Sequence, residues 1–253
     1  MVKVQPKKTG YGKFYALLVG IAVVAGAAIY KSSGEPKVDA FAVDPNLPPV
    51  QVEGYRLGNP DAPVEVLEWA DFECPGCMQF ATVTEPDVRE RLIRTGQISY
   101  RFFFFPLPDH KASAAASYAA ACAGDQNKFW EMHDAIFNGF NDWSWGRVRD
   151  PKGVFKGYAE RLGLDIATWE ACYDSDKHHA LITSHKAEGL RRGVNATPTF
   201  VIGNRMVSGA IGYDQFKALV DSAMVLAGAK APAAPTGGDT AATRAVPVAP
   251  AAR

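Results

Sequence analysis

Two patterns of apolar and polar positions follow one another along the middle of the chain. The runs 64–70 and 98–105 are mostly apolar, rich in β-branched and aromatic residues, and bounded by turn signals. Such runs predict buried strands. Between them, residues 75–95 carry a helical pattern that ends with Arg94 and Gly96, both typical of a helix C-terminus.

A long helical block and a hairpin follow. From about 111 to about 193 the periodicity is helical, and Asp165 is expected to cap one of its helices. The runs 199–202 and 205–208 flank Gly203-Asn204, a two-residue hairpin signal, and a last helix extends to Gly228. The order predicts an α/β fold in which a mixed sheet is interrupted by a helical insertion at about 111–193.

The N-terminal segment contains seventeen uncharged residues, 14–30, after a basic tip at 1–13. As a helix they would span roughly 26 Å, close to the thickness of a bilayer core. The lysines of the tip predict a transmembrane signal anchor with the rest of the chain outside the cytoplasm, on the periplasmic or extracellular face. A cleaved signal peptide is the main alternative, because Ala25-Gly26-Ala27 suits signal peptidase, and a buried helix of a soluble fold is the third.

Two other segments differ from the folded unit, which we place at 50–228. Residues 31–49 contain four prolines and are expected to form an extended tether. Residues 229–253 are mainly Ala, Pro, Thr and Gly, too poor in large apolar side chains to bury a core, so we expect a disordered tail.

Composition excludes several functions. The 27 basic and 27 acidic residues leave no net positive field, so a nucleic-acid partner is not expected. The sequence has no phosphate-binding or dinucleotide-binding glycine loop and no HExxH motif, so we expect no cofactor. Four cysteines are too few for a disulfide-dense scaffold.

The candidate chemistry is the motif Cys74-Pro75-Gly76-Cys77, at the junction of the first strand and its helix. Cys74 is expected at the helix N-terminus, where free N–H groups favour an exposed thiolate nucleophile. Cys77, one turn further in, is the expected resolving thiol. The alternatives are an inert disulfide and a zinc half-site, but Cys122, Cys172 and the five histidines show no compact ligand spacing, so no metal is expected.

The run Asp71-Phe72-Glu73 before this motif, together with Ala196-Thr197-Pro198-Thr199 far downstream, resembles the DsbA-like thiol:disulfide oxidoreductases. The resemblance implies a thioredoxin fold with an inserted helical domain. It further implies that Pro198 is cis and faces the cysteines, with the Thr197 backbone available to a substrate strand. An ordinary trans proline at the entrance to a strand is the alternative.

The resemblance also implies a buried acid at Glu68, six residues before Cys74. A carboxylate buried there would have a raised pKa and could exchange the proton of Cys77. The alternative is a surface glutamate, since Glu65 shows that this strand accepts acids.

Cys122 and Cys172 complete an even number of cysteines and fall on two helices of the insertion. In an oxidising compartment we expect them to form a structural disulfide, as some members of the resembled family carry a second bridge in this domain. Two buried free thiols are the alternative.

The expected activity is disulfide formation in exported proteins with free thiols, followed by reoxidation through a quinone-linked membrane partner, as the resemblance implies. Strongly oxidising members of the family have Pro-His between the cysteines, whereas this chain has Gly76. A disulfide reductase or isomerase therefore remains an alternative, and a redox-inert peptide-binding module is the alternative from another class.

Overall fold

The computed structural model describes residues 12–32 and 40–228 of the chain. The chain divides into two compact units, Met1–Val38 and Asp39–Arg253, which are considered separately. Most of the basic tip, the start of the predicted tether and the whole tail 229–253 lie outside the described residues.

The first unit contains helix α1 (Gly12–Ser32), which includes the apolar stretch 14–30. Among the helices of the described ranges, none is long and apolar enough to cross a bilayer.

The second unit is built on a six-stranded sheet with the order β1-β6-β5-β3-β4-β2. The strands are β1 (Ala40–Ala42), β2 (Tyr55–Leu57), β3 (Val64–Ala70), β4 (Ile98–Phe104), β5 (Thr199–Ile202) and β6 (Arg205–Ser208). Strands β3 and β4 pair in parallel, with Glu68 opposite Phe102, and the other neighbours are antiparallel. The two long predicted strands are thus confirmed as the centre of a mixed sheet.

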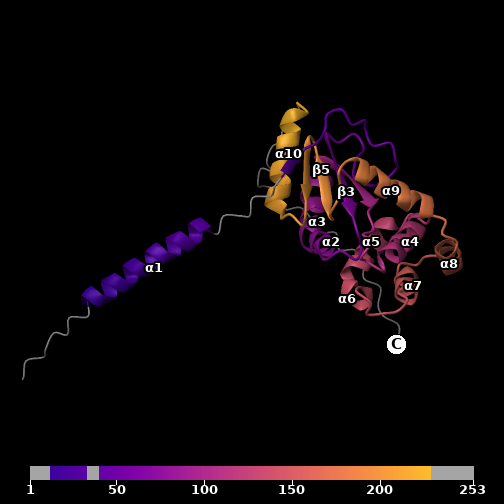
Figure 1. The fold of residues 1–253 in the computed structure, drawn as a ribbon, viewed down its shortest axis with the longest axis horizontal. Coiled ribbons are helices and arrows are strands. Elements are labelled where there is room, and N and C mark those ends of the chain that lie inside the picture. The colour runs from indigo at the N-terminus through magenta and orange to yellow at the C-terminus, as the bar shows by residue number, and fades with distance from the viewer. Residues whose placement is uncertain (1–11, 33–39, 229–253) are drawn as a thin grey trace, which may run out of the picture. The chain divides into compact units, whose positions relative to one another are not determined.

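Helices cover both faces of this sheet (Figure 1), which is why β3 and β4 are buried along almost their whole length. Helices α10 (Tyr213–Leu226) and α3 (Glu85–Val88) lie on one side, where Phe80 packs between Phe200 and Phe216. Helix α9 (His179–Arg191) lies on the other, where the Trp69 indole donates to the His185 carbonyl at 3.1 Å.

The segment after β3 is helical from Pro75 to Ile93, which confirms the predicted helical stretch, but it is not one regular α-helix. It consists of α2 (Pro75–Gln79), η1 (Phe80–Thr84), α3 and η2 (Arg89–Ile93), and both η segments are π-helical. Within this stretch, Pro86 has no N–H to donate to the carbonyl of Thr82, four residues earlier. The Glu85 N–H instead bonds the Phe80 carbonyl, five residues back, so the backbone widens by one residue beside the proline.

The helical insertion lies beside the sheet (Figure 1) and shares a hydrophobic core with β3, β4 and the cysteine motif. Its helices are α4 (Ser113–Gly124), α5 (Phe129–Asn138), α6 (Phe140–Trp143), α7 (Lys152–Arg161), α8 (Ile166–Asp174) and α9. Asp165 caps α8 as predicted, because its carboxylate accepts the Thr168 N–H at 2.7 Å. The buried Trp169 indole donates to the Ala119 carbonyl at 3.1 Å and joins α8 to α4.

The two shortest strands were not predicted. Strand β1 lies inside the supposed tether 31–49, yet Ala40 pairs with Val207 at the edge of the sheet. Arg192 also donates to the Pro48 carbonyl at 2.6 Å. The prediction of a free tether up to residue 49 was therefore wrong, because backbone pairing at a sheet edge needs no apolar pattern in the added strand.

Candidate active site

Cys74 lies at the N-terminus of α2, directly beyond the carboxyl end of β3, as the sequence pattern predicts. Its backbone is extended, with φ −82° and ψ 125°, and Pro75 occupies the first helical position. The Cys74 N–H donates to the Asp71 carbonyl at 3.0 Å, which closes the turn between strand and helix. The sulfur therefore sits where the helix presents its unpaired N–H groups.

The surroundings of Cys74 stabilise its thiolate. A hydrogen bond from the Cys77 thiol lowers the pKa of Cys74 to about 5, with smaller support from Thr197 and the backbone of Gly76 and Cys77, while burial opposes the shift. The residue is only 8 % exposed, whereas an exposed nucleophile was predicted. At neutral pH Cys74 is thus a thiolate that is only slightly exposed to solvent.

Cys77 has the opposite character. It is 1 % exposed, and burial raises its pKa well above the usual range, with further increases from Cys74 and from the charge of Glu68. The Asp71 N–H, 3.4 Å from the Cys77 sulfur, only partly offsets this. The two free cysteines form a thiolate–thiol pair with the thiol on the inside.

The predicted substrate-binding residues lie against this pair. The Thr197–Pro198 peptide bond is cis, and the Thr197 carbonyl oxygen is 3.2 Å from the Cys74 sulfur. A Cβ atom at Gly76 would lie 3.3 Å from Pro198 Cδ and 3.8 Å from the Cys74 sulfur. Gly76 therefore allows the proline loop to approach the cysteine motif closely.

Glu68 is 3 % exposed, which excludes the surface alternative. The Tyr100 hydroxyl donates to its carboxylate at 2.7 Å. Burial raises the pKa of Glu68 well above its usual range, and the charges of Glu85 and Cys74 add to the shift, while Tyr100 and Arg89 oppose it. Since the charge of Glu68 also raises the pKa of Cys77, the acid and the inner thiol interact electrostatically.

A buried ionic cluster next to Glu68 was not found in the sequence. Glu85 is 1 % exposed, contacts Arg89 at 2.7 Å, and lies 3.8 Å from the His133 ring. Neither Glu85 Oε2 nor His133 Nε2 has a hydrogen-bond partner among the described residues. Arg89 continues to Asp134 at the surface, 2.8 Å away. The i,i+4 spacing of Glu85 and Arg89 is the one sequence signal, and it is common on exposed helices.

Two further buried carboxylates hold the active-site turn, and they too were missed. Asp71 accepts the N–H groups of Glu73 at 2.7 Å and Leu107 at 2.8 Å, and it contacts the His110 ring at 2.7 Å. Glu73 accepts the N–H groups of Ala112 and Trp145, each at 2.7 Å. These bonds tie the residues just before Cys74 to the helical insertion. The run Asp71-Phe72-Glu73 marks them in the sequence, but not their partners.

The second cysteine pair is not part of this site. Cys122 on α4 and Cys172 on α8 form a disulfide with a Cα–Cα distance of 5.8 Å. The predicted pairing is confirmed, and the alternative of two free thiols is excluded. The structure thus brings Cys74, Cys77, Glu68, Thr197 and Pro198 together and places Cys122 and Cys172 within the insertion.

Comparisons with known proteins agree with this geometry. Residues 51–222 match the Thioredoxin family model. The chain is 37 % identical over 178 residues to the Na(+)/H(+) antiporter NhaA 1 of Salinispora arenicola, a match that uses 69 % of this chain. It is 24 % identical over 173 residues to disulfide bond formation protein D of Bacillus subtilis, covering 65 % of this chain and 74 % of that protein. The chain spans only 26 % of the length of the antiporter.

Solved structures show the same fold. Oxidised BdbD from Bacillus subtilis superposes with a TM-score of 0.61 at 21 % identity, covering 70 % of this chain and 98 % of that one. Alpha-DsbA1 from Wolbachia pipientis superposes with a TM-score of 0.63 at 24 % identity, covering 72 % and 95 %. The fold is therefore the thioredoxin fold with the helical insertion that the resemblance implied.

Proposed function

This chain belongs to the thioredoxin family, and we propose that it is a DsbA-like thiol:disulfide oxidoreductase that forms disulfides in exported proteins outside the cytoplasm. The thiolate–thiol pair carries the proposal, because the pKa of Cys74 is lowered to about 5 and that of Cys77 is raised. A stabilised Cys74 thiolate is a good leaving group, which favours donation of a disulfide to substrates.

The pair performs the exchange in two steps. In the oxidised enzyme, a substrate thiolate attacks the Cys74 sulfur, the Cys74–Cys77 bond breaks, and Cys77 leaves with the electron pair and takes up a proton. A second substrate thiolate then attacks the substrate sulfur of the mixed disulfide, and Cys74 leaves as a thiolate. The substrate loses two electrons, and its two thiol protons go to Cys77 and to solvent.

Glu68 has the role of proton carrier for Cys77. Cys77 is enclosed, so its proton needs a buried partner, and Glu68 interacts with it electrostatically. Because burial raises the pKa of Glu68, its carboxyl group holds a proton more readily than an exposed glutamate and can pass that proton to Cys77.

Thr197 and Pro198 form the substrate platform. The Thr197 carbonyl already lies 3.2 Å from the Cys74 sulfur, so a peptide strand paired with this backbone would bring its own cysteine to Cys74. The close packing of Gly76 on Pro198 leaves this backbone uncovered by a side chain at position 76.

A location outside the cytoplasm is supported by the Cys122–Cys172 disulfide, since structural disulfides persist mainly in oxidising compartments. Substrates would be exported proteins with free thiols. Each turnover leaves the enzyme reduced by two electrons, so an oxidant is needed, and a quinone-linked membrane protein is the partner we propose.

A disulfide reductase or isomerase is the second candidate, because Gly76 supplies no imidazolium to the Cys74 thiolate. The reduction potential of the Cys74–Cys77 pair separates the two. The full chain is equilibrated with glutathione buffers, trapped by alkylation, and the state of Cys74 is read by mass spectrometry. A value of about −120 mV is expected for an oxidase, whereas about −270 mV would identify a reductase. Absence of a reversible couple would leave a redox-inert peptide-binding module.

A further inference from the structure

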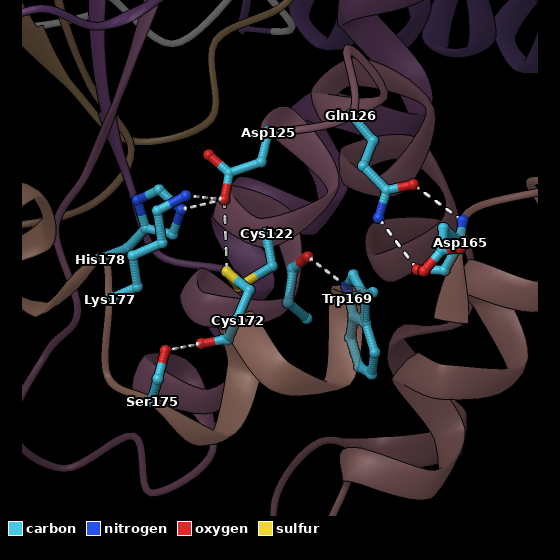
Figure 2. Close-up of a disulfide and its surroundings, with 10 residues drawn as sticks. Cys122, Asp125, Gln126, Asp165, Trp169, Cys172, Ser175, Lys177 and His178 are labelled. Atoms are coloured by element: carbon cyan, nitrogen blue, oxygen red, sulfur yellow. Dashed lines mark hydrogen bonds and ion pairs between the residues drawn. A yellow bond between two sulfur atoms is a disulfide. The ribbon is translucent and has the colours of Figure 1, made fainter. Parts of the chain in front are cut away.

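The Cys122–Cys172 disulfide lies in a cluster of side chains that are typical metal ligands (Figure 2). A ring nitrogen of His178, just before α9, and the two sulfurs all lie within 4.8 Å of one another. Asp125, which follows α4, directs its carboxylate toward the same point. The cluster is on α4, α8 and the start of α9, and it shares no residue with the active site.

Two distances within the cluster are close to those around one tetrahedral ion. Asp125 Oδ2 lies 3.0 Å from His178 Nε2 and 3.4 Å from the Cys172 sulfur. Because a disulfide sulfur has no proton to donate, the second distance is a contact and not a hydrogen bond. Around tetrahedral zinc, with bonds of about 2.0–2.3 Å, the corresponding O···N and O···S separations are about 3.4 and 3.6 Å.

We propose that Cys122, Cys172, His178 and Asp125 bind one Zn²⁺ ion when the disulfide between the two cysteines is reduced. A dithiol reductant supplies two electrons and two protons, the S–S bond breaks, and the reductant becomes a disulfide. The two thiols then release their protons to solvent as two Zn–S bonds form. The same two sulfur atoms form either the S–S bond or the two Zn–S bonds. The ion therefore binds only when this cysteine pair is reduced.

A cation already lies beside the Asp125 carboxylate in the oxidised state. Lys177 Nζ is 2.8 Å from Asp125 Oδ2, so its ammonium group competes with an entering metal ion for this oxygen. Two thiolates and one carboxylate with Zn²⁺ carry a net charge of −1, which Lys177 balances. The Lys177 side chain is 57 % exposed, so it can withdraw from the carboxylate when the ion enters.

Other contacts hold α4 and α8 together without the disulfide. Trp169 on α8 donates to the Ala119 carbonyl at 3.1 Å, and Gln126 exchanges two hydrogen bonds with the backbone of Asp165, at 2.8 and 3.1 Å (Figure 2). With the Cα atoms of the cysteines 5.8 Å apart, rotation of the side chains is enough to place both sulfurs on one ion. The side chain of His178 is 12 % exposed and that of Asp125 27 %, which gives the ion a path from solvent.

The test uses the full chain with Cys74→Ser and Cys77→Ser, which removes the other dithiol and makes the result independent of the proposed exchange activity. The protein is reduced with a phosphine and titrated with Co²⁺, a spectroscopic substitute for Zn²⁺. We expect one equivalent of tetrahedral cobalt with thiolate-to-metal charge-transfer absorption, displaced by Zn²⁺ and absent from the disulfide form.

His178→Ala should weaken Co²⁺ binding at least tenfold, whereas His179→Ala, the adjacent histidine that contacts Tyr118 instead, should not. Circular dichroism of each reduced variant establishes that the helices remain. Absence of the charge-transfer band in the reduced protein would overturn the proposal. Equal binding by the His178 and His179 variants would overturn it as well, because unfolded thiols alone would then hold the metal.

Discussion

Cys74 and Cys77 are three residues apart on one helical turn, whereas Cys122 and Cys172 are 50 residues apart on two different helices. Hydrogen-bond donors surround Cys74 and stabilise its thiolate. Cys172 instead is bonded to Cys122, and its sulfur lies 3.4 Å from the Asp125 carboxylate. The comparison teaches that the reactivity of a thiol depends on its immediate donors, while a cross-link needs only that packing brings two sulfurs together.

The largest difference between the pairs is expected in catalysis. Cys74→Ser should abolish oxidation of a dithiol substrate, because no other described group can form the mixed disulfide at this position. The double variant Cys122→Ser with Cys172→Ser should keep most of the activity. A fluorogenic dithiol peptide measures both rates. Comparable activity of the two proteins would contradict the assignment of exchange to Cys74.

For stability we expect the reverse order, with a larger loss when Cys122 and Cys172 are replaced than when Cys74 and Cys77 are replaced. Removing the Cys122–Cys172 disulfide frees a loop of 50 residues and should lower the free energy of unfolding by about 2–4 kcal/mol in urea titrations. Replacing Cys74 and Cys77 together by Ser should change it by less, since no long loop is released. A larger loss in the second variant would reverse the division between a structural and a reactive pair.

Substitution of Glu73 tests the hydrogen bonds that hold the turn before Cys74 in place. Glu73→Gln places an amide NH₂ inside the protein against one of the two N–H groups, of Ala112 or Trp145, that bind this buried carboxylate, which should cost about 1–3 kcal/mol of unfolding free energy. Glu90→Gln is the matched control, because the Glu90 side chain is 61 % exposed. Equal stability of the two variants would show that the hydrogen bonds of Glu73 to Ala112 and Trp145 do not stabilise the turn.

Substitution of Glu68 should affect the stability of the fold and the rate of thiol exchange in different ways. Because the folded pKa of Glu68 is raised, its stabilising contribution is complete below the unfolded pKa and is lost as pH rises through the folded pKa. Glu68→Gln should therefore be more stable than the parent at pH 8 and no more stable at pH 4, while its exchange through Cys77 slows. A rate that stays unchanged across this pH range would remove Glu68 from the mechanism.

The smallest expected effect is on how the reduction potential of the Cys74–Cys77 pair changes with pH. Between pH 5 and the raised pKa of Cys77, reduction of the Cys74–Cys77 disulfide takes up one proton for two electrons. The potential should fall by about 30 mV per pH unit in this range, and by about 59 mV per unit below pH 5. Potentials measured at several pH values give the slope. A slope of about 59 mV throughout would mean that Cys74 is not a thiolate at neutral pH.

Local features were predicted well. Strand β3, the hairpin of β5 and β6, and the Asp165 cap depend on short runs of apolar residues or on a single turn, so the sequence contains the full signal. Strands β1 and β2 were missed because three half-exposed residues show no periodicity. The Glu85–His133 contact was missed because its residues are 48 positions apart and each alone is an ordinary polar residue.

By itself, the sequence determined the strand, the cysteine motif and the helix that follows, because a helix N-terminus acts on a thiol through neighbouring backbone groups. Tertiary structure decided that Thr197 meets Cys74 from 123 residues away and that Glu68 is buried beside Tyr100. It also brought Cys122, Cys172 and His178 together, with Asp125 beside Cys172 and His178, where the sequence shows no ligand spacing. The physical reason is that burial and long-range contact arise from the packing of whole elements, which no single segment encodes.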